Sequence, residues 1–218
     1  MPNLTADGDV LILDLGEDEN RFSPDLLDAT MTALEEIATA DGPAALVTIG
    51  TGKFFSNGLD LDWLGAHPNE MGSYVARVQE LYIRVLTLPV PTIAAVNGHA
   101  FGAGAMLAAA HDFRVMREDR GFFCLPEVDI QIPFTEGMAA LLQAKLTPAT
   151  ATEAMTTGRR YGGADALTAG IVDAVAAEAE LRATAIERIR PLAGKHRETL
   201  AAIKATMHAS VIEALRRG

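Results

Sequence analysis

The chain has 218 residues, 49% of them hydrophobic, so it can bury a full core as one domain. Its 29 acidic and 18 basic residues give a formal net charge of −11, which argues against nucleic-acid partners, because these require a basic face. The single cysteine fits a reducing compartment, and neither a secretory signal nor a membrane-spanning apolar run is present, so we expect a cytoplasmic protein without a membrane partner.

The predicted elements alternate between strands and helices, a pattern typical of an α/β protein with a largely parallel sheet. Ser23 as a cap and Pro24 in the first turn mark the start of the first helix, and Pro89 ends the second. Apolar runs predict strands at 9–15, 44–50, 91–97, 112–116 and 121–128. Helices are expected at 23–41 and 70–89, and a short one follows the glycine-rich stretch and ends at about residue 111. The pattern is then helical at 136–146, 148–157, 164–170 and through "IVDAVA". A long helix or helix pair is expected at 178–217, broken near Pro191 and Gly194. Residues 51–65 are expected to form a loop.

The stretch "NGHAFGAGAML" at 97–107 places three glycines between a predicted strand and a predicted helix. Free N–H groups and the helix dipole at such a point can hold an anion, or stabilise one that forms during a reaction. Tight strand-to-helix packing without a ligand explains the glycines equally well. A dinucleotide-binding fingerprint is disfavoured, because Leu107 stands where the third glycine should be.

Two further segments carry candidate chemistry. "FFSNGLDLDW" at 54–63 places Gly58 after a predicted strand and before a predicted helix. "RGFFCLPEVDI" at 120–130 surrounds Glu127 with apolar residues, which should raise the pKa of its carboxyl group and make it a usable proton acceptor. A solvated glutamate at a strand end remains the alternative for Glu127.

Together with "TGRRYGGADALTAGIVD", these segments resemble the crotonase superfamily of enoyl-CoA hydratases and isomerases, from the first strand to about residue 175. The resemblance implies a Clp/crotonase-type spiral of ββα units with a helical C-terminal region. It implies a core at 1–175 and a C-terminal helical segment at 176–218 that is shorter than in many members. It also implies a homotrimer or a dimer of trimers, an acyl-CoA thioester substrate, and no metal or separate cofactor, since coenzyme A is part of the substrate.

The resemblance assigns each catalytic position of the family to one residue of this chain. The backbone N–H groups of Leu59 and Ala103 correspond to the oxyanion hole, and Glu127 corresponds to the second catalytic glutamate of the hydratases. Met106 stands where the hydratases carry their first glutamate, and methionine can neither activate water nor donate a proton. The pattern is therefore most similar to the Δ3,Δ2-enoyl-CoA isomerases of the plant and peroxisomal type.

Other residues near these motifs are candidates for substrate contact. Lys53 is a candidate for a CoA phosphate on charge alone, whereas Phe54, Phe55, Trp63 and Phe134 either line an acyl pocket or belong to the core. The full set of predicted substrate-binding residues is Lys53, Phe55, Ser56, Asn57, Gly58, Gly102, Gly104, Met106 and Phe134.

Polar residues outside this set have simpler explanations. Asp60 and Asp62 are expected to cap a helix or face solvent, and His99 and Asn97 to be structural. Ser56 has no His and Asp arrangement around it, which argues against a serine protease on the related fold. Glu136 should cap the next helix.

Three functions are consistent with the sequence. The first is an isomerase that moves a 3-enoyl-CoA double bond to the 2-trans position, in fatty-acid metabolism such as β-oxidation. The second is an enoyl-CoA hydratase or another crotonase lyase that combines Glu127 with a substitute acid such as Glu136. The third is a non-catalytic acyl-CoA binder.

Overall fold

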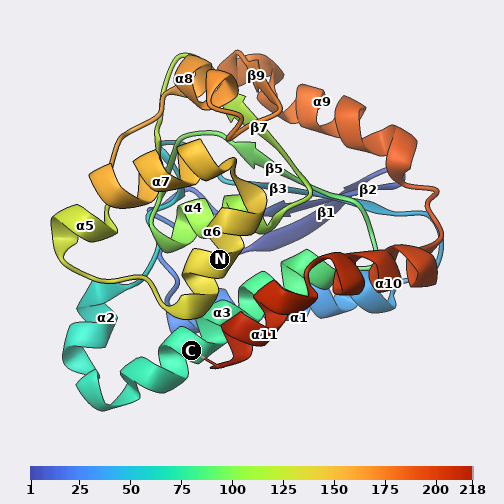
Figure 1. The fold of residues 1–218 in the computed structure, drawn as a ribbon. Helices are drawn as coiled ribbons and strands as arrows, with labels where there is room; N and C mark the ends of the chain where they lie inside the picture. Colours follow the sequence, from blue (N-terminus) through green and yellow to red (C-terminus); the bar gives the residue numbers. More distant parts are fainter. Residues whose placement is uncertain (218) are drawn as a thin grey trace.

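Two sheets, of six and three strands, organise the fold in this computed structural model, which describes residues 1–217 (Figure 1). The larger sheet has the order β1-β2-β3-β5-β7-β9, in which β1 pairs antiparallel and the other pairs are parallel. The smaller sheet, β4-β6-β8, is parallel throughout. The strands are β1 (Asn3–Asp7), β2 (Val10–Asp14), β3 (Ala45–Ile49), β4 (Phe54–Ser56), β5 (Thr92–Val96), β6 (His99–Phe101), β7 (Phe113–Arg117), β8 (Phe123–Cys124) and β9 (Ala174–Ala176).

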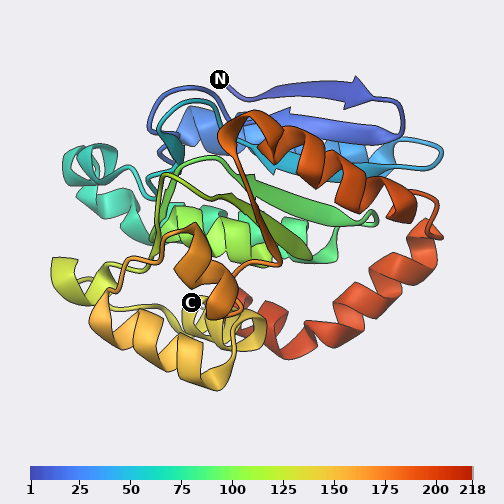
Figure 2. The same ribbon diagram turned by 90° about the horizontal axis from the view of Figure 1, so that it is seen from above.

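Helices cover both faces of the larger sheet (Figures 1 and 2). α9 packs on one face, and α1 and α3 lie on the other, with α10 and α11 on the same side. The helices are α1 (Pro24–Thr39), α2 (Leu61–Ala66), α3 (Met71–Thr87), α4 (Ala103–Ala110), α5 (Glu127–Ile130), α6 (Glu136–Lys145), α7 (Pro148–Thr157), α8 (Gly163–Thr168), α9 (Glu178–Ile189), α10 (Arg197–Met207) and α11 (Ala209–Arg217), with 3-10 turns at Pro68–Glu70 and Arg190–Leu192.

Strand alternation divides the buried side chains between two cores. In β2, Ile12 joins the cluster under α9, whereas Leu13 joins the larger cluster under α1 and α3, because successive side chains of a strand point to opposite faces. The segment after 175 contributes to both cores, through Leu181 and Ile186 on one face and Val211 and Leu215 on the other. The predicted boundary at 175 falls inside β9.

Most of the predicted elements are confirmed. Ser23 caps α1 by accepting a hydrogen bond from the Leu26 N–H at 3.2 Å, and the sheet is largely parallel as expected. The predicted break in the last helical segment is also present, at the 3-10 turn Arg190–Leu192 and the residues after it. In residues 1–217, no helix has the length and apolar character needed to cross a bilayer.

Three local predictions are wrong, and one strand was not predicted. The strand expected at 121–128 is only Phe123–Cys124, because Pro126 turns the chain and its carbonyl accepts the N–H groups of Asp129 and Ile130, so Glu127 begins a short helix. The loop expected at 51–65 contains β4 and α2. "IVDAVA" ends in β9, which pairs with β7, and Asn3–Asp7 forms an edge strand that its polar, exposed composition concealed.

Candidate active site

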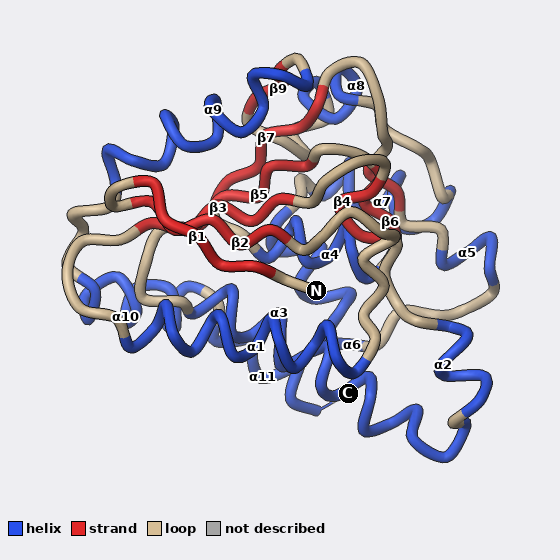
Figure 3. The backbone as a smooth tube through the Cα atoms, turned by 180° about the vertical axis from the view of Figure 1, so that it is seen from behind, coloured by secondary structure: helices blue, strands red, loops and turns tan. Residues whose placement is uncertain are grey.

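The smaller sheet brings the three predicted motifs to one place. Its parallel strands end at Ser56, Phe101 and Cys124, and Figure 3 shows β4 and β6 beyond the ends of the larger sheet. Ligands bind characteristically outside the carboxyl ends of parallel strands. A cavity of about 430 Å³ lies there, lined by Arg21, Asn57, Leu59, Leu61, Asp62, Phe101, Gly102, Ala103, Met106, Pro126, Glu127, Ile130, Ile132, Pro133 and Met138.

The loops that carry Leu59 and Ala103 are packed directly against each other. Gly58 has φ +82°, and a Cβ added there would lie 2.7 Å from the Phe101 carbonyl oxygen and 3.1 Å from the Ala103 nitrogen. A Cβ on Gly104 would collide with the Ser56 carbonyl oxygen. These two glycines therefore allow an approach that brings the backbone of Leu59 close to the first residue of α4.

Both backbone donors are free. Among the described residues, the N–H groups of Leu59 and Ala103 donate to no protein acceptor, and both residues line the cavity. Ala103 is the first residue of α4, so its N–H belongs to the unsatisfied donors at the positive end of a helix. The two donors are suited to holding a negatively charged oxygen.

Glu127 lies beside these donors. Its side chain is only 8% exposed, its Oε2 has no hydrogen-bond partner, and a Cβ on Gly102 would lie 3.3 Å from its Oε1. Burial raises the pKa of Glu127 from 4.5 to about 7, because desolvation disfavours the charged carboxylate. The cavity thus places a buried carboxyl group of near-neutral pKa close to two unpaired backbone N–H groups.

The raised pKa predicts a stability cost at alkaline pH. The folded state binds the Glu127 proton more tightly than the unfolded chain, so stability is lost as the pH rises from 4.5 through 7, by about 2–3 kcal/mol between pH 5 and pH 8. Glu127→Gln removes this cost, so the variant should be more stable than the natural protein at pH 8, and by a smaller margin at pH 5. Urea unfolding at both pH values measures the difference. A gap that does not widen with pH would contradict the burial of an uncompensated carboxyl group.

Two tyrosines of α3 hold the loops, and the sequence analysis missed both. The Tyr82 hydroxyl donates to the Ala103 carbonyl oxygen at 3.0 Å. The Tyr74 hydroxyl donates to the Phe22 carbonyl oxygen at 2.8 Å and accepts the Asp60 N–H at 2.9 Å. Their spacing of eight residues, on the same apolar face of a helix as Val78, was the available signal, because a buried tyrosine usually bonds its hydroxyl group.

The predicted site residues divide into two groups. Asn57, Leu59, Gly102, Ala103, Met106 and Glu127 line the cavity, whereas Lys53, Phe55, Ser56, Gly58, Gly104 and Phe134 do not. Phe55 and Phe134 pack in the core, and Gly58 and Gly104 join the two loops. Ser56 is fully buried and donates to the Asn20 carbonyl oxygen at 2.7 Å, and Lys53 is exposed with its ammonium over the Phe54 ring. The structure therefore gives these six residues no contact with this cavity.

No second acid faces Glu127 in the described part of the chain. Glu136 is exposed in the first turn of α6, outside the cavity, and the cap of that helix is Thr135 rather than Glu136. Asp62 lines the mouth, but its side chain is 87% exposed and forms an ion pair with Arg21. Asp60 caps α2 through the Trp63 N–H, as predicted.

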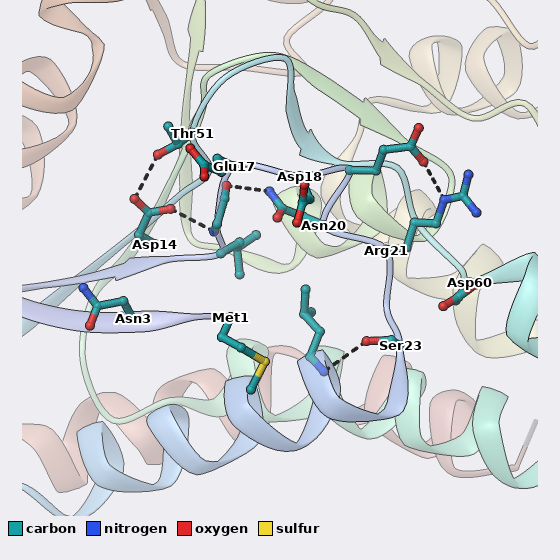
Figure 4. A pocket seen from close by; sticks show the side chains of 14 residues that line it. Met1, Asn3, Asp14, Glu17, Asp18, Asn20, Arg21, Ser23, Thr51 and Asp60 are labelled. Carbon is teal, nitrogen blue, oxygen red and sulfur yellow. Dashed lines mark hydrogen bonds and ion pairs between the residues drawn. The ribbon is translucent and has the colours of Figure 1, made fainter.

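A larger cavity, of about 690 Å³, adjoins the first through Arg21 (Figure 4). Its wall is acidic, with Asp14 at the end of β2 and Glu17, Asp18 and Glu19 on the loop between β2 and α1. Asp14 accepts the Gly16 N–H at 2.9 Å and the Thr51 hydroxyl at 3.0 Å, so its carboxylate is engaged in holding the loop. This cavity lacks a buried carboxyl group comparable with Glu127, and its charge disfavours phosphates.

The family sequence model described as enoyl-CoA hydratase/isomerase matches residues 10–218. The chain belongs to the enoyl-CoA hydratase/isomerase family. It is 39% identical over 183 residues to enoyl-CoA delta isomerase 3 of Arabidopsis thaliana, covering 81% of this chain and 77% of the relative. It is 38% identical over 189 residues to the peroxisomal enoyl-CoA delta isomerase 2 of the same plant, covering 83% and 79%. Among solved structures, a probable enoyl-CoA hydratase of Mycobacterium tuberculosis is 26% identical with a TM-score of 0.91, covering 100% of this chain and 92% of that one.

Membership in the enoyl-CoA hydratase/isomerase family fits the observed architecture. The solved hydratase superposes along the full chain, so the crotonase fold expected from the motifs is confirmed. The two plant relatives carry isomerase names, whereas the mycobacterial structural relative is named a hydratase in one solved structure and an isomerase in another. The choice between these reactions for this family member therefore rests on the acids and bases of its own cavity.

Proposed function

We propose that this member of the enoyl-CoA hydratase/isomerase family converts a 3-enoyl-CoA into the 2-trans-enoyl-CoA, with Glu127 as the sole proton carrier. The observation that carries the proposal is the cavity itself, in which Glu127 is buried beside two free amides and the uncharged Met106 lines the wall. The family resemblance aligns Met106 with the other catalytic position of the hydratases. The names of the plant relatives support the same reaction.

The reaction needs one base and one site for negative charge. The Glu127 carboxylate removes a proton from carbon 2, and the electron pair of that C–H bond moves toward the thioester oxygen, giving a dienolate. The N–H groups of Leu59 and Ala103 stabilise that oxygen as its charge develops. Protonated Glu127 then returns the proton to carbon 4, and the double bond forms between carbons 2 and 3. No atom is gained or lost, so the reaction needs neither water nor a redox partner.

The hydratase alternative requires a second acid or base beside Glu127. One group must position and deprotonate the water, and another must deliver the proton to carbon 2. Glu136, the substitute acid considered from the sequence, is exposed and outside the cavity. The third alternative, a binder without turnover, offers no reason to keep Glu127 buried and without a partner for Oε2 at a cost in stability.

The direct test uses two substrates. Purified protein is given 3-hexenoyl-CoA and, separately, 2-hexenoyl-CoA, and the products are followed by absorbance and by mass. The proposal expects 3-hexenoyl-CoA to gain conjugation at unchanged mass. A gain of one water by 2-hexenoyl-CoA, with no isomerisation, would assign a hydratase, and binding without any product would assign the non-catalytic reading.

The rate should depend on pH through Glu127. The reaction needs the ionised carboxylate, and burial raises the pKa of this group to about 7, so kcat/KM should fall as the pH is lowered through 7 and level off above it. A pH series from 5.5 to 9 with 3-hexenoyl-CoA measures the profile. A rate that stays flat down to pH 5.5 would mean that the base is a carboxyl group of ordinary pKa.

We further propose that the protein assembles as a homotrimer or a dimer of trimers and acts in the cytoplasm in fatty-acid β-oxidation, with coenzyme A arriving only as part of the substrate. The family resemblance supports the assembly and the role of coenzyme A, and the single cysteine supports a reducing compartment such as the cytoplasm. Light scattering after size-exclusion chromatography tests the assembly. In residues 1–217 no three His, Cys, Asp or Glu side chains are grouped to hold a metal ion.

A further inference from the structure

A separate cavity, of about 350 Å³, lies at the opposite ends of the larger-sheet strands from those that lead into the active site. Pro91 and Asp112 precede β5 and β7, Lys145 ends α6, and Ile203 lies on α10. The whole wall consists of Pro91, Asp112, Phe113, Lys145, Leu192, Lys195, Leu200, Ile203, Lys204 and Met207. None of these residues lines the active-site cavity, so the two are distinct.

Part of the wall of this cavity is apolar and exposed. Ile203 and Met207 are 55% and 61% exposed and lie one helical turn apart on α10, with Leu200, Leu192 and Phe113 completing the surface. Aliphatic side chains held at the mouth of a pocket favour an apolar occupant, because covering them removes their surface from water.

The same wall also carries cations. Three of the four lysines in the chain, Lys145, Lys195 and Lys204, line this one cavity, in a protein whose net charge is −11. Asp112 is the carboxylate of the wall, and it is already engaged. Its Oδ2 accepts the buried Lys204 ammonium at 2.5 Å and the Thr92 N–H at 2.8 Å.

Lys145 therefore has no counter-ion. Within residues 1–217, its ammonium makes no ion pair or hydrogen bond, although the residue is half-buried. Burial lowers the pKa of Lys145 to about 8, with Arg114 and Lys204 adding repulsion and Asp112 and Asp173 opposing it, while His111 and His208 are also within electrostatic reach. An anion beside Lys145 would satisfy a cation that the fold leaves uncompensated.

We propose that this cavity binds a medium-chain aliphatic carboxylate, with the carboxylate between Lys145 and Lys195 and the chain along Leu200, Ile203 and Met207. The volume is at the lower end of small-ligand sites, which suits an acyl chain with its carboxylate rather than a nucleotide-bearing thioester. The site is independent of the catalytic assignment, because it shares no residue with the Glu127 cavity.

Calorimetric titration with octanoate tests the site in the intact protein. Octanoate is expected to bind the natural protein, and Lys145→Gln and Met207→Asp are each expected to weaken it about tenfold or more, because one removes the cation and the other puts a charge against the chain. 1-Octanol, which lacks the carboxylate, should bind more weakly than octanoate. Octanoate binding that survives both substitutions would place it elsewhere and overturn the proposal, as would no binding at all.

A second readout follows the lysines directly and does not depend on a variant folding. After ¹³C-methylation of the amines, the Lys145 resonance should shift and its pKa should rise on saturation with octanoate, while Lys53, which lies outside the cavity, should not change. If octanoate shifted the Lys145 and Lys53 resonances equally, or shifted neither, the proposed site would be wrong. If Met207→Asp instead dissociates an oligomer and octanoate moves no lysine resonance, this face is an interface between copies of the chain, and the ligand proposal is wrong.

Discussion

Replacing Glu127 with glutamine is expected to lower the turnover of 3-hexenoyl-CoA by about 100- to 10,000-fold, the range in which a positioned acid or base contributes to rate. Glutamine keeps the size of the side chain but cannot carry the proton from carbon 2 to carbon 4. The substrate should still bind, because the cavity walls and the two amides are unchanged. Steady-state rates give kcat, and calorimetric titration with the product gives the binding constant.

Glu136→Gln is the matched control. It makes the same chemical change at an exposed carboxylate, nine residues further along the chain and outside the cavity. Its turnover should equal that of the natural protein. If Glu127→Gln retained near-normal turnover while Glu136→Gln lost it, the base would be misassigned and the hydratase reading with Glu136 would have to be reconsidered.

The sequence predicted the parts of the site that depend on local chemistry. The glycines of "NGHAFGAGAML", the neighbouring apolar residues of Glu127 and the proline before it are all visible in the chain, and the structure brings Leu59, Ala103, Met106 and Glu127 to one cavity. Long elements with clear periodicity, such as α1 with its Ser23 cap, were also predictable, because local signals determine where they begin.

The parts that could not be predicted depend on contacts between distant segments. Ile130, Ile132 and Met138 line the cavity only because α5 and the start of α6 fold over it, which no local pattern indicates. Phe55 shares its motif with cavity residues but is fully buried in the core, because β4 as a whole is packed behind the cavity wall and only the residues after it reach the cavity. The hydrogen bond from the Tyr82 hydroxyl to the Ala103 carbonyl oxygen joins residues that are 21 positions apart in the sequence.

The same separation in sequence explains why the cavity lined by the three lysines was not predicted. Lys145, Lys195 and Lys204 are spread over 60 residues, and each by itself reads as a solvated cation on a helix or loop. Only the fold places them around one apolar wall and commits Asp112 to Lys204 and Thr92. A cluster of like charges assembled from distant segments has no sequence signature, so it is found from the structure alone.

Removing the backbone donor at Ala103 is the second substitution with a large expected effect. Ala103 is the first residue of α4, a position at which proline fits a helix well, and the preceding Gly102 has no Cβ to clash with the proline ring. Ala103→Pro should therefore fold, yet it lacks the N–H and puts ring carbons in its place. Losing one oxyanion donor lowers the rate by about 100- to 1,000-fold, and the expected loss in kcat is at least of this size.

Ala103→Gly separates the missing donor from a mere change of side chain. Glycine restores the N–H at the same position, so this variant should keep most of its turnover, at a small cost in helix stability. Comparing thermal unfolding of both variants confirms that α4 still forms, and kcat for 3-hexenoyl-CoA gives the effect on catalysis. If the folded proline variant turned over normally, the dienolate oxygen would have to be held by other groups, and the pairing of Leu59 with Ala103 as the oxyanion site would be wrong. If both variants lost activity equally, the Ala103 side chain rather than its amide would be what the reaction requires.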